Sequence, residues 1–430
     1  MRVPFRPCVA ALAAALWLAL PSPAQALDLA TAMEAAAGRN EQARAALLRL
    51  ESAERGQVVA RGGFLPNATF SGSLIRNDTE IAVGDRNFTN LYDYAGRLQV
   101  QVPLVNLTQF AVRDTANAQF DQADATATLR QADLRLATGR AYVAALAAEQ
   151  TLAAAAERVN LARASLEQVQ VLLEGGFEIA ATLAQVELQV QQALSDEIRA
   201  RLDRDNARSN LAFLMGDDMD ALQQELLMDV ELPALPTTPS RLLATEAVAA
   251  TAVEIAHAAL RSSRFAWAPT LDLVGQYNLG RPSLRAPNGT FWTVTLALNW
   301  AFLDPGRQAR IEGAAAIEEA AALEQQLVER NVLQQRGLAD RALMAAEASL
   351  QATLAQVEVA IRNEELQRDR FTAGDATALE LTEAQTALFE ARSALALAEL
   401  QCHLSHLDQL YLAGALDAPL VSVNSDGDPP

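Results

Sequence analysis

The stretch AALAAEQTLAAAAERVNLARASLEQVQVLLEGG, residues 144–176, decides the fold, because the chain repeats its pattern as ALMAAEASLQATLAQVEVAIRNEELQRDRFTAG at residues 342–374. A single offset aligns the two copies without a gap. The identical positions that carry the match are Glu149 with Glu347, Leu152 with Leu350, Val159 with Val357, Ala162 with Ala360, Glu167 with Glu365 and Gly176 with Gly374. A duplication this long sets the architecture before any single residue is interpreted.

A second pair of matching segments extends the repeat beyond these two stretches. FLPNATFSGS (Phe64–Ser73) corresponds to WAPTLDLVGQ (Trp267–Gln276), with Pro66 aligned to Pro269. In each half, the order of patterns predicts a helix, a strand, a loop, a strand, a very long helix, a tight turn and a last helix. The molecule is therefore predicted to consist of two similar units.

Residues 1–26 have the composition of a cleaved signal peptide. Arg2 and Arg6 give a basic start, Val9–Leu20 is apolar, and Ala24–Ala26 forms a small-residue cleavage site. The apolar run is too short for an ordinary membrane-spanning helix, although an N-terminal anchor is the alternative interpretation. We expect the mature chain to be exported.

The remaining boundaries follow from composition. The first repeat is predicted over 27–231 and the second over 241–412. Between them, LPALPTTPS (residues 232–240) contains three prolines and suits an extended linker. The tail 413–430 is rich in Asp, Ser, Gly and Pro, so we expect it to be disordered.

The charge and cysteine content exclude several function classes. The full chain carries a formal net charge of -19, and all of its basic side chains except three histidines are arginines. So acidic a surface argues against a nucleic-acid partner. Only Cys402 remains after removal of the signal peptide, so no intrachain disulfide can form.

The helical segments are unusually long. A first helix is predicted from Asp28 to Arg61, with a shorter counterpart over Ala244–Arg264. Thr108–Leu173 contains no proline and one glycine, and at 1.5 Å per residue it would extend on the order of 100 Å. Such a helix must pack lengthwise on its neighbours. The heptad seam that predicts this packing is Leu152, Val159, Leu166 and Leu173 with Ala155, Ala162 and Val169, and, in the other half, Leu381, Leu388, Leu395 and Cys402 with Ala384, Ala391 and Ala398.

Four segments alternate between apolar and polar residues with period two, which predicts strands. They are Ala68–Leu74, Tyr92–Val102, Leu271–Leu279 and Trp292–Trp300. On a soluble protein the apolar face would pack on a core, whereas in an outer membrane it would face lipid and the polar face would line water. Trp292 and Trp300, at the two ends of one strand, fit an interfacial aromatic girdle, and the exported context favours the membrane interpretation.

These features together resemble the TolC-type outer-membrane efflux family. FLPNATFSGS resembles that family's entry into its first strand, and VPLVN (Val102–Asn106) and WAFLDPGRQA (Trp300–Ala309) resemble its two exits from strand into long helix. FTAGDATALELTEAQTALFEAR (Phe371–Arg392) resembles its helix-turn-helix hairpin. The resemblance covers nearly the whole mature chain and occurs in order in both halves.

The resemblance implies an α+β membrane protein that forms a homotrimer. Four strands cannot close a barrel alone, whereas three chains would supply a 12-stranded transmembrane β-barrel, continued by a long α-helical barrel through the periplasm. The implied function is the outer-membrane exit duct of a tripartite efflux or type I secretion system. Its implied partners are outer-membrane lipid, a periplasmic adaptor protein and an inner-membrane transporter. The exported substrate, whether drug, metal or protein, is left open.

The hairpin turns at Gly176 and Gly374 would lie at the far end of the tunnel, where the family has its constriction. Glu380 and Glu383 match the acidic gate positions of that family, and their spacing of three places them on one helical face. In a trimer they would form a ring of carboxylates that favours cations. The blander interpretation is that both are solvated side chains on a helix surface.

Other functions are less well supported by the sequence. His403, His406 and Asp408 lie close together, but three isolated ligands rarely make a metal site, so no metal or other cofactor is predicted. No catalytic constellation is recognisable, and no enzyme activity is predicted. The alternative to the duct is a soluble periplasmic coiled-coil adaptor or scaffold, which would share the helices but would not need lipid-facing strands.

Overall fold

The structure is a computed structural model that describes residues 27–79, 81–83, 86–89, 92–175, 180–216, 226–227, 243–280 and 289–418. The predicted signal peptide (1–26), the predicted linker (232–240) and Gly176 lie outside the described residues. The elements of the first repeat are α1 (Leu29–Arg39), α2 (Glu41–Gly62), β1 (Asn67–Arg76), β2 (Ile81–Val83), β3 (Arg86–Thr89), β4 (Tyr92–Val105), α3 (Leu107–Glu174) and α4 (Ala180–Met215). Those of the second are α5 (Ala244–Phe265), β5 (Thr270–Gly280), β6 (Gly289–Asn299), α6 (Arg307–Ala373) and α7 (Ala378–Leu412).

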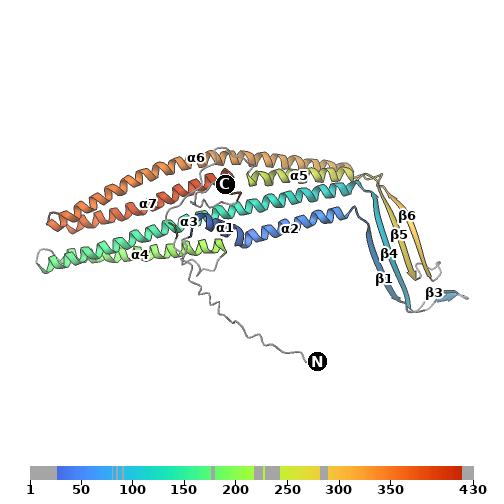
Figure 1. Cartoon of the computed structure of the whole chain (residues 1–430), viewed down its shortest axis with the longest axis horizontal. Coiled ribbons are helices and arrows are strands. Elements are labelled where there is room, and N and C mark those ends of the chain that lie inside the picture. Colours follow the sequence, from blue (N-terminus) through green and yellow to red (C-terminus); the bar gives the residue numbers. More distant parts are fainter. Residues whose placement is uncertain are drawn as a thin grey trace, which may run out of the picture.

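The molecule is a long helical bundle with a sheet at one end (Figure 1). Each repeat has one helix that runs the length of the bundle, α3 with 68 residues and α6 with 67. Near the sheet, α3 packs on α2 and α6 packs on α5. Towards the other end, α3 forms a hairpin with α4, and α6 forms a hairpin with α7. The predicted order of elements is therefore present in both halves.

The predicted heptad seam lies where the helices meet. Ala155, Val159, Ala162 and Val169 are buried on α3, and Leu381, Ala384, Leu388 and Ala391 are buried on α7. Alanines at these positions let the helix backbones approach closely, which is how helices this long are stabilised without a compact core. No helix within the described residues is long and apolar enough to cross a membrane.

The predicted first helix is wrong in one respect, because the chain breaks at Asn40. There ψ is 138°, and the side chain accepts a hydrogen bond from the Gln42 backbone N–H at 2.8 Å, which caps α2. The Asn40 amide also donates to the Leu214 carbonyl at 3.0 Å. The break thus ties the α1–α2 junction to the end of α4, a non-local contact that helical periodicity does not encode.

All four predicted strands form, in one antiparallel sheet of order β1-β4-β5-β6. The β1–β4 and β5–β6 pairs belong to the first and second repeats, and the β4–β5 pairing joins the two repeats. A short hairpin, β2–β3, lies beyond the end of the β1–β4 pair (Figure 1).

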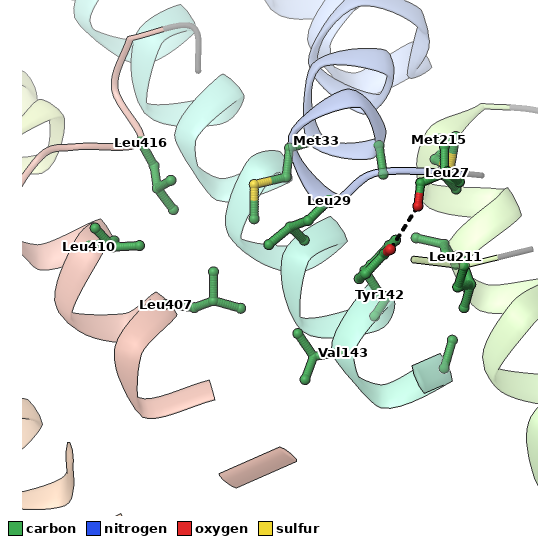
Figure 2. Packing of buried hydrophobic residues seen from close by; sticks show 14 residues of the cluster. Leu27, Leu29, Met33, Tyr142, Val143, Leu211, Met215, Leu407, Leu410 and Leu416 are labelled. Atoms are coloured by element: carbon green, nitrogen blue, oxygen red, sulfur yellow. Dashed lines mark hydrogen bonds between the residues drawn. The ribbon is translucent and has the colours of Figure 1, made fainter. Parts of the chain in front are cut away.

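The largest apolar core lies midway along the bundle, where α1, α3, α4 and α7 meet. Figure 2 shows Tyr142 of α3 pointing between Leu27 and Leu211, with Leu407, Leu410 and Leu416 on the α7 side. The Tyr142 hydroxyl donates to the Leu27 carbonyl at 2.7 Å and to the Leu227 carbonyl at 3.1 Å. Burial raises the pKa of Tyr142 to about 12, so the hydroxyl keeps its proton and acts as a donor.

The predicted tail begins too early, because the turn after α7 places Ala415 and Leu416 in this core. The Leu416 side chain is 0% exposed, and its carbonyl accepts a hydrogen bond from Arg135 at 2.9 Å. Arg135 is itself buried and pairs with Glu34 of α1 at 3.0 Å. The chain after α7 therefore closes over the middle of the bundle.

Candidate gate and membrane-facing sheet

The two predicted gate residues lie at the start of α7, close to the tip of the second hairpin. Glu380 and Glu383 are both exposed, as is Leu379 beside them. Neither makes an ion pair with a described residue. The spacing of three residues keeps the two carboxylates on one side of the helix.

The structure shows a local role for Glu380 that the sequence analysis missed. Its carboxylate accepts a hydrogen bond from the Thr377 backbone N–H at 2.7 Å, while the Thr377 hydroxyl accepts one from the Glu380 N–H at 3.3 Å. The Thr377 hydroxyl also donates to the same carboxylate at 3.1 Å, and the two hydrogen bonds that Thr377 donates, from its backbone N–H first and from its hydroxyl second, lower the pKa of Glu380. The signal was present as Thr-x-x-Glu before an apolar run, the pattern of a capping box.

The turn before α7 depends on Gly374. Its φ is +83°, a left-handed conformation that glycine adopts without steric cost, and the Asp375 N–H closes the turn on the Arg370 carbonyl at 2.8 Å. In the first hairpin, Thr182 and Gln185 occupy the places of Glu380 and Glu383 near the start of α4, with Thr182 partly buried and Gln185 exposed.

Behind the exposed carboxylates, the two hairpins pack on each other. Val169 of α3, Val186 of α4 and Phe371 of α6 form one buried cluster with Ala378 and Leu381 of α7. Because residues from both repeats share this cluster, moving one hairpin tip relative to the other would expose apolar surface.

Polar contacts continue this junction away from the tip. The Gln385 amide donates to the Ser165 hydroxyl at 3.1 Å, and the Thr382 hydroxyl donates to Gln189 at 2.8 Å. Ser165, Gln189 and Gln385 are all buried. The Gln189 Nε2 atom is buried without a hydrogen-bond partner among the described residues. This part of the junction is therefore incompletely satisfied.

Further along, charged groups join the same helices. Arg392 of α7 pairs with Glu157 of α3. Arg158 of α3 pairs with Asp196 of α4 and lies over the Phe389 ring of α7, 4.8 Å from its centroid. The contacts between the hairpins thus change from apolar at the tip to polar and charged along the bundle.

At the other end, the sheet has one apolar and one polar face. The register aligns Phe70, Leu98, Tyr277 and Trp292 across the four strands, and the next row of that face ends at Val294. On the opposite face, Gln99 and Gln276 bond at 3.2 Å, and Arg97 donates to Asn278 at 3.1 Å. The apolar face is unpartnered in the single chain, whereas the polar face is hydrogen-bonded across strands.

Trp292 and Trp300 lie on the apolar side towards the two ends of β6. Trp292 is 73% exposed, and Trp300 follows the last residue of the strand. Eight residues of strand separate them, about 26 Å at 3.3 Å per residue. That separation is close to the roughly 25 Å apolar band of a transmembrane barrel before any strand tilt is considered.

Among the residues that the structure describes, no group of three or more His, Cys, Asp or Glu side chains is arranged to hold a metal ion. Burial lowers the pKa of His403 on α7.

The comparisons with known proteins agree on this architecture. Residues 32–217 and 247–413 match the model of the family described as outer membrane efflux protein. No sequence among the curated proteins matches the chain. Among solved structures, a membrane protein from Pseudomonas aeruginosa is similar at 18% identity and a TM-score of 0.77, over 90% of this chain and 91% of that one.

Two further structures are similar over most of their length. The Campylobacter jejuni CmeC outer membrane channel has 16% identity and a TM-score of 0.77, over 90% of this chain and 85% of that one. The open state of the Neisseria gonorrhoeae MtrE outer membrane channel has 20% identity and a TM-score of 0.71, over 91% and 89%. At these identities the likeness establishes the fold.

Proposed function

The chain belongs to the outer membrane efflux protein family and is an outer-membrane channel that extends into the periplasm, and we propose that three copies of it form one passive exit duct. The soluble adaptor alternative is not favoured, because the family match covers both repeats, including their strands. The family consists of channel proteins, and no enzyme activity is proposed.

The trimer is supported by the elements at the two lateral sides of the molecule. On both sides, the outermost strand and the outermost helix have no neighbour on their outer edge among the described residues of the single chain. In the sheet, β1 and β6 are edge strands, and in the hairpin region α4 and α6 are the outer helices (Figure 1). Both outer helices expose large apolar side chains, which are Leu188, Ile198 and Leu202 on α4 and Leu354, Val359 and Leu366 on α6. A head-to-tail contact would pair unlike edges, and such contacts close into a ring when the rotation between copies allows it.

Three copies of the sheet would supply twelve strands, enough to close a barrel and satisfy every edge in lipid. The row from Phe70 to Trp292 would then face lipid, and the Gln99–Gln276 and Arg97–Asn278 pairs would face the water-filled interior. The long helices α3 and α6 would continue this interior as a tunnel.

The tips of the hairpins are proposed to receive the partners, a periplasmic adaptor and an inner-membrane transporter. Opening would separate α6/α7 from α3/α4 and would therefore break the Ser165–Gln385 and Thr382–Gln189 contacts. The junction contains a buried donor without a partner among the described residues, and we infer that the hairpins have two alternative packings there.

Glu380 and Glu383 are proposed to line the constriction at these tips. Three chains would place six carboxylates around one axis, which attract cations and repel one another. Support comes from their exposure in the single chain, which leaves both carboxylates accessible near the hairpin tip.

Neighbouring residues of β6 allow a matched test of the duct. Leu296 lies on the apolar face and Thr295 on the polar face. Leu296→Arg should place a charge in lipid at a cost of about 2–4 kcal/mol and strongly reduce the yield of membrane-inserted trimer, whereas Thr295→Arg should assemble normally. The readouts are native mass of the detergent-extracted protein and conductance in planar bilayers. Equal behaviour of the two variants, or a protein released by carbonate without detergent, would contradict the duct.

A further inference from the structure

A cluster of aromatic side chains with one arginine lies where β6 leaves the sheet. Trp300 and Trp267 pack edge to face with ring centroids 5.6 Å apart, and the Trp300 indole N–H donates to the Trp267 carbonyl at 3.1 Å. Phe302 stands 6.1 Å from Trp300. The Arg307 guanidinium lies over the Trp267 ring, 4.8 Å from its centroid. These contacts fix the three rings and the cation as one unit, the Trp267–Arg307 cluster.

The surface next to this cluster is apolar and exposed. Phe302 and Leu303 are 73% and 79% exposed, values that are high for side chains of this size in a connection between a strand and a helix. Phe302 contacts Trp300, which follows the exposed apolar residues Val294, Leu296 and Leu298 of β6. The patch therefore extends the lipid-facing surface towards the periplasmic end of the sheet.

The guanidinium of Arg307 forms no ion pair with a carboxylate among the described residues. Asp304 in the same turn pairs with Arg310, and its carboxylate also accepts the Gly306 N–H at 3.0 Å. Within the described part of the chain no carboxylate pairs with Arg307, and its Nε, shielded from solvent, has no hydrogen-bond partner. A guanidinium in this setting can still bind a phosphate through its remaining N–H groups.

The first repeat lacks this cation. Its junction has an edge-to-face pair as well, Phe64 with Phe110 at 4.9 Å. However, the residue that begins its long helix is Leu107, where the second repeat has Arg307. The charged cluster therefore occurs once in each chain and three times in a trimer.

We propose that the Trp267–Arg307 cluster binds a glycerophospholipid of the inner leaflet, with the phosphate on Arg307 and the acyl chains along Phe302 and Leu303. This inference rests on the proposed insertion of the sheet in the outer membrane. Indole rings favour the boundary between acyl chains and headgroups, and an arginine beside them can reach the phosphate. Continuity with the lipid-facing rows selects lipid over a second copy of the chain as the occupant.

The test is native mass spectrometry of the detergent-purified trimer titrated with dioleoylphosphatidylglycerol. Wild-type trimer should retain up to three lipids, and Arg307→Gln should weaken retention about tenfold, the loss expected for one charge-assisted contact. Arg113→Gln is the matched control, because Arg113 is an exposed arginine near the start of the long helix in the first repeat. Its retention of lipid should equal that of the wild type.

Two further arms identify what is bound. Dioleoylglycerol, which lacks phosphate, should be retained far less well, and inorganic phosphate at the same concentration should not displace the phospholipid. Equal retention by wild type and Arg307→Gln, or equal retention of dioleoylglycerol, overturns the proposal and is the result expected if a neighbouring copy covers the patch. If the trimer still conducts but lipid retention is equal in this way, only the lipid site is contradicted. If the protein fails to insert as a trimer, the proposed function itself is contradicted.

Discussion

The first hairpin, α3/α4, and the second, α6/α7, have nearly the same length but differ in how their tips are packed and charged. Helix α7 lies between α6 and α3, so its tip is packed from both repeats, whereas α4 lies at the edge of the single chain (Figure 1). Phe371 of the second hairpin is buried, while Leu173, its equivalent in the first, is only partly buried. The exposed positions differ too, with Glu380 and Glu383 where the first hairpin has Thr182 and Gln185.

The difference shows which parts of a duplicated hairpin are free to change. The buried seam positions of α7 nearest the tip have apolar counterparts in α4, because they set the distance between helices; the pairs are Leu381 with Leu183, Ala384 with Val186, Leu388 with Val190 and Ala391 with Ala193. Exposed positions at the tip carry no such constraint, so one copy can acquire charge. A ring of six hairpins would then alternate between tips that carry Glu380 and Glu383 and tips that carry Thr182 and Gln185 at the same places.

The largest effect should come from emptying the tip cluster in the second hairpin. Phe371→Ala removes a buried ring and should lower the local stability of the tip by about 3 kcal/mol, or roughly 100-fold in amide exchange rates around Gly374. Leu173→Ala should have a much smaller effect in the first hairpin, because its side chain is already partly exposed. Hydrogen exchange monitored by mass spectrometry measures both. Equal effects of the two substitutions would show that the tips are packed alike.

A smaller effect is expected from the cap of α7. Thr377→Ala should remove the two hydrogen bonds between the Thr377 hydroxyl and Glu380 and leave the one that the Thr377 backbone N–H donates to the carboxylate. It should speed amide exchange in the first turn of α7 roughly threefold to tenfold and let the pKa of Glu380 rise part of the way towards its ordinary value. Since folding lowers this pKa, the stabilisation by the carboxylate is complete above the ordinary pKa and is lost as the pH falls through the lowered one. Carboxyl ¹³C shifts of labelled glutamate report the titration. An unchanged titration in Thr377→Ala would mean that the Thr377 hydroxyl does not contribute to the lowered pKa of Glu380.

Much of this fold could be predicted because its local patterns are long and regular. The seam from Ala155 to Val169 repeats every heptad, and the alternation from Trp292 to Leu298 defines a strand and its two faces. Patterns of this kind indicate which face of an element is buried. In a duplicated chain the same order of elements is predicted independently from each half.

The remaining features depend on contacts between distant parts of the chain. The break at Asn40 is stabilised by α4, and Leu416 is ordered by Arg135, so neither appears in the periodicity of its own segment. The tip cluster joins Val169 to Phe371, which belong to different repeats. The Thr-x-x-Glu pattern of a capping box is present in the sequence at Thr377, but Glu380 was interpreted there as a gate residue only. That both glutamates line a constriction is still a proposal.

The second hairpin is proposed to control a cation-favouring constriction in a trimeric duct. The most direct test is the reversal potential of the reconstituted channel in a potassium chloride gradient, measured for wild type, for Glu380→Gln with Glu383→Gln, and for Thr182→Glu with Gln185→Glu. We predict that the wild type selects cations, that the first double variant loses selectivity or gains conductance, and that the second strengthens selectivity. An unchanged reversal potential and conductance in Glu380→Gln with Glu383→Gln would contradict the claim and leave the two glutamates as surface residues of α7.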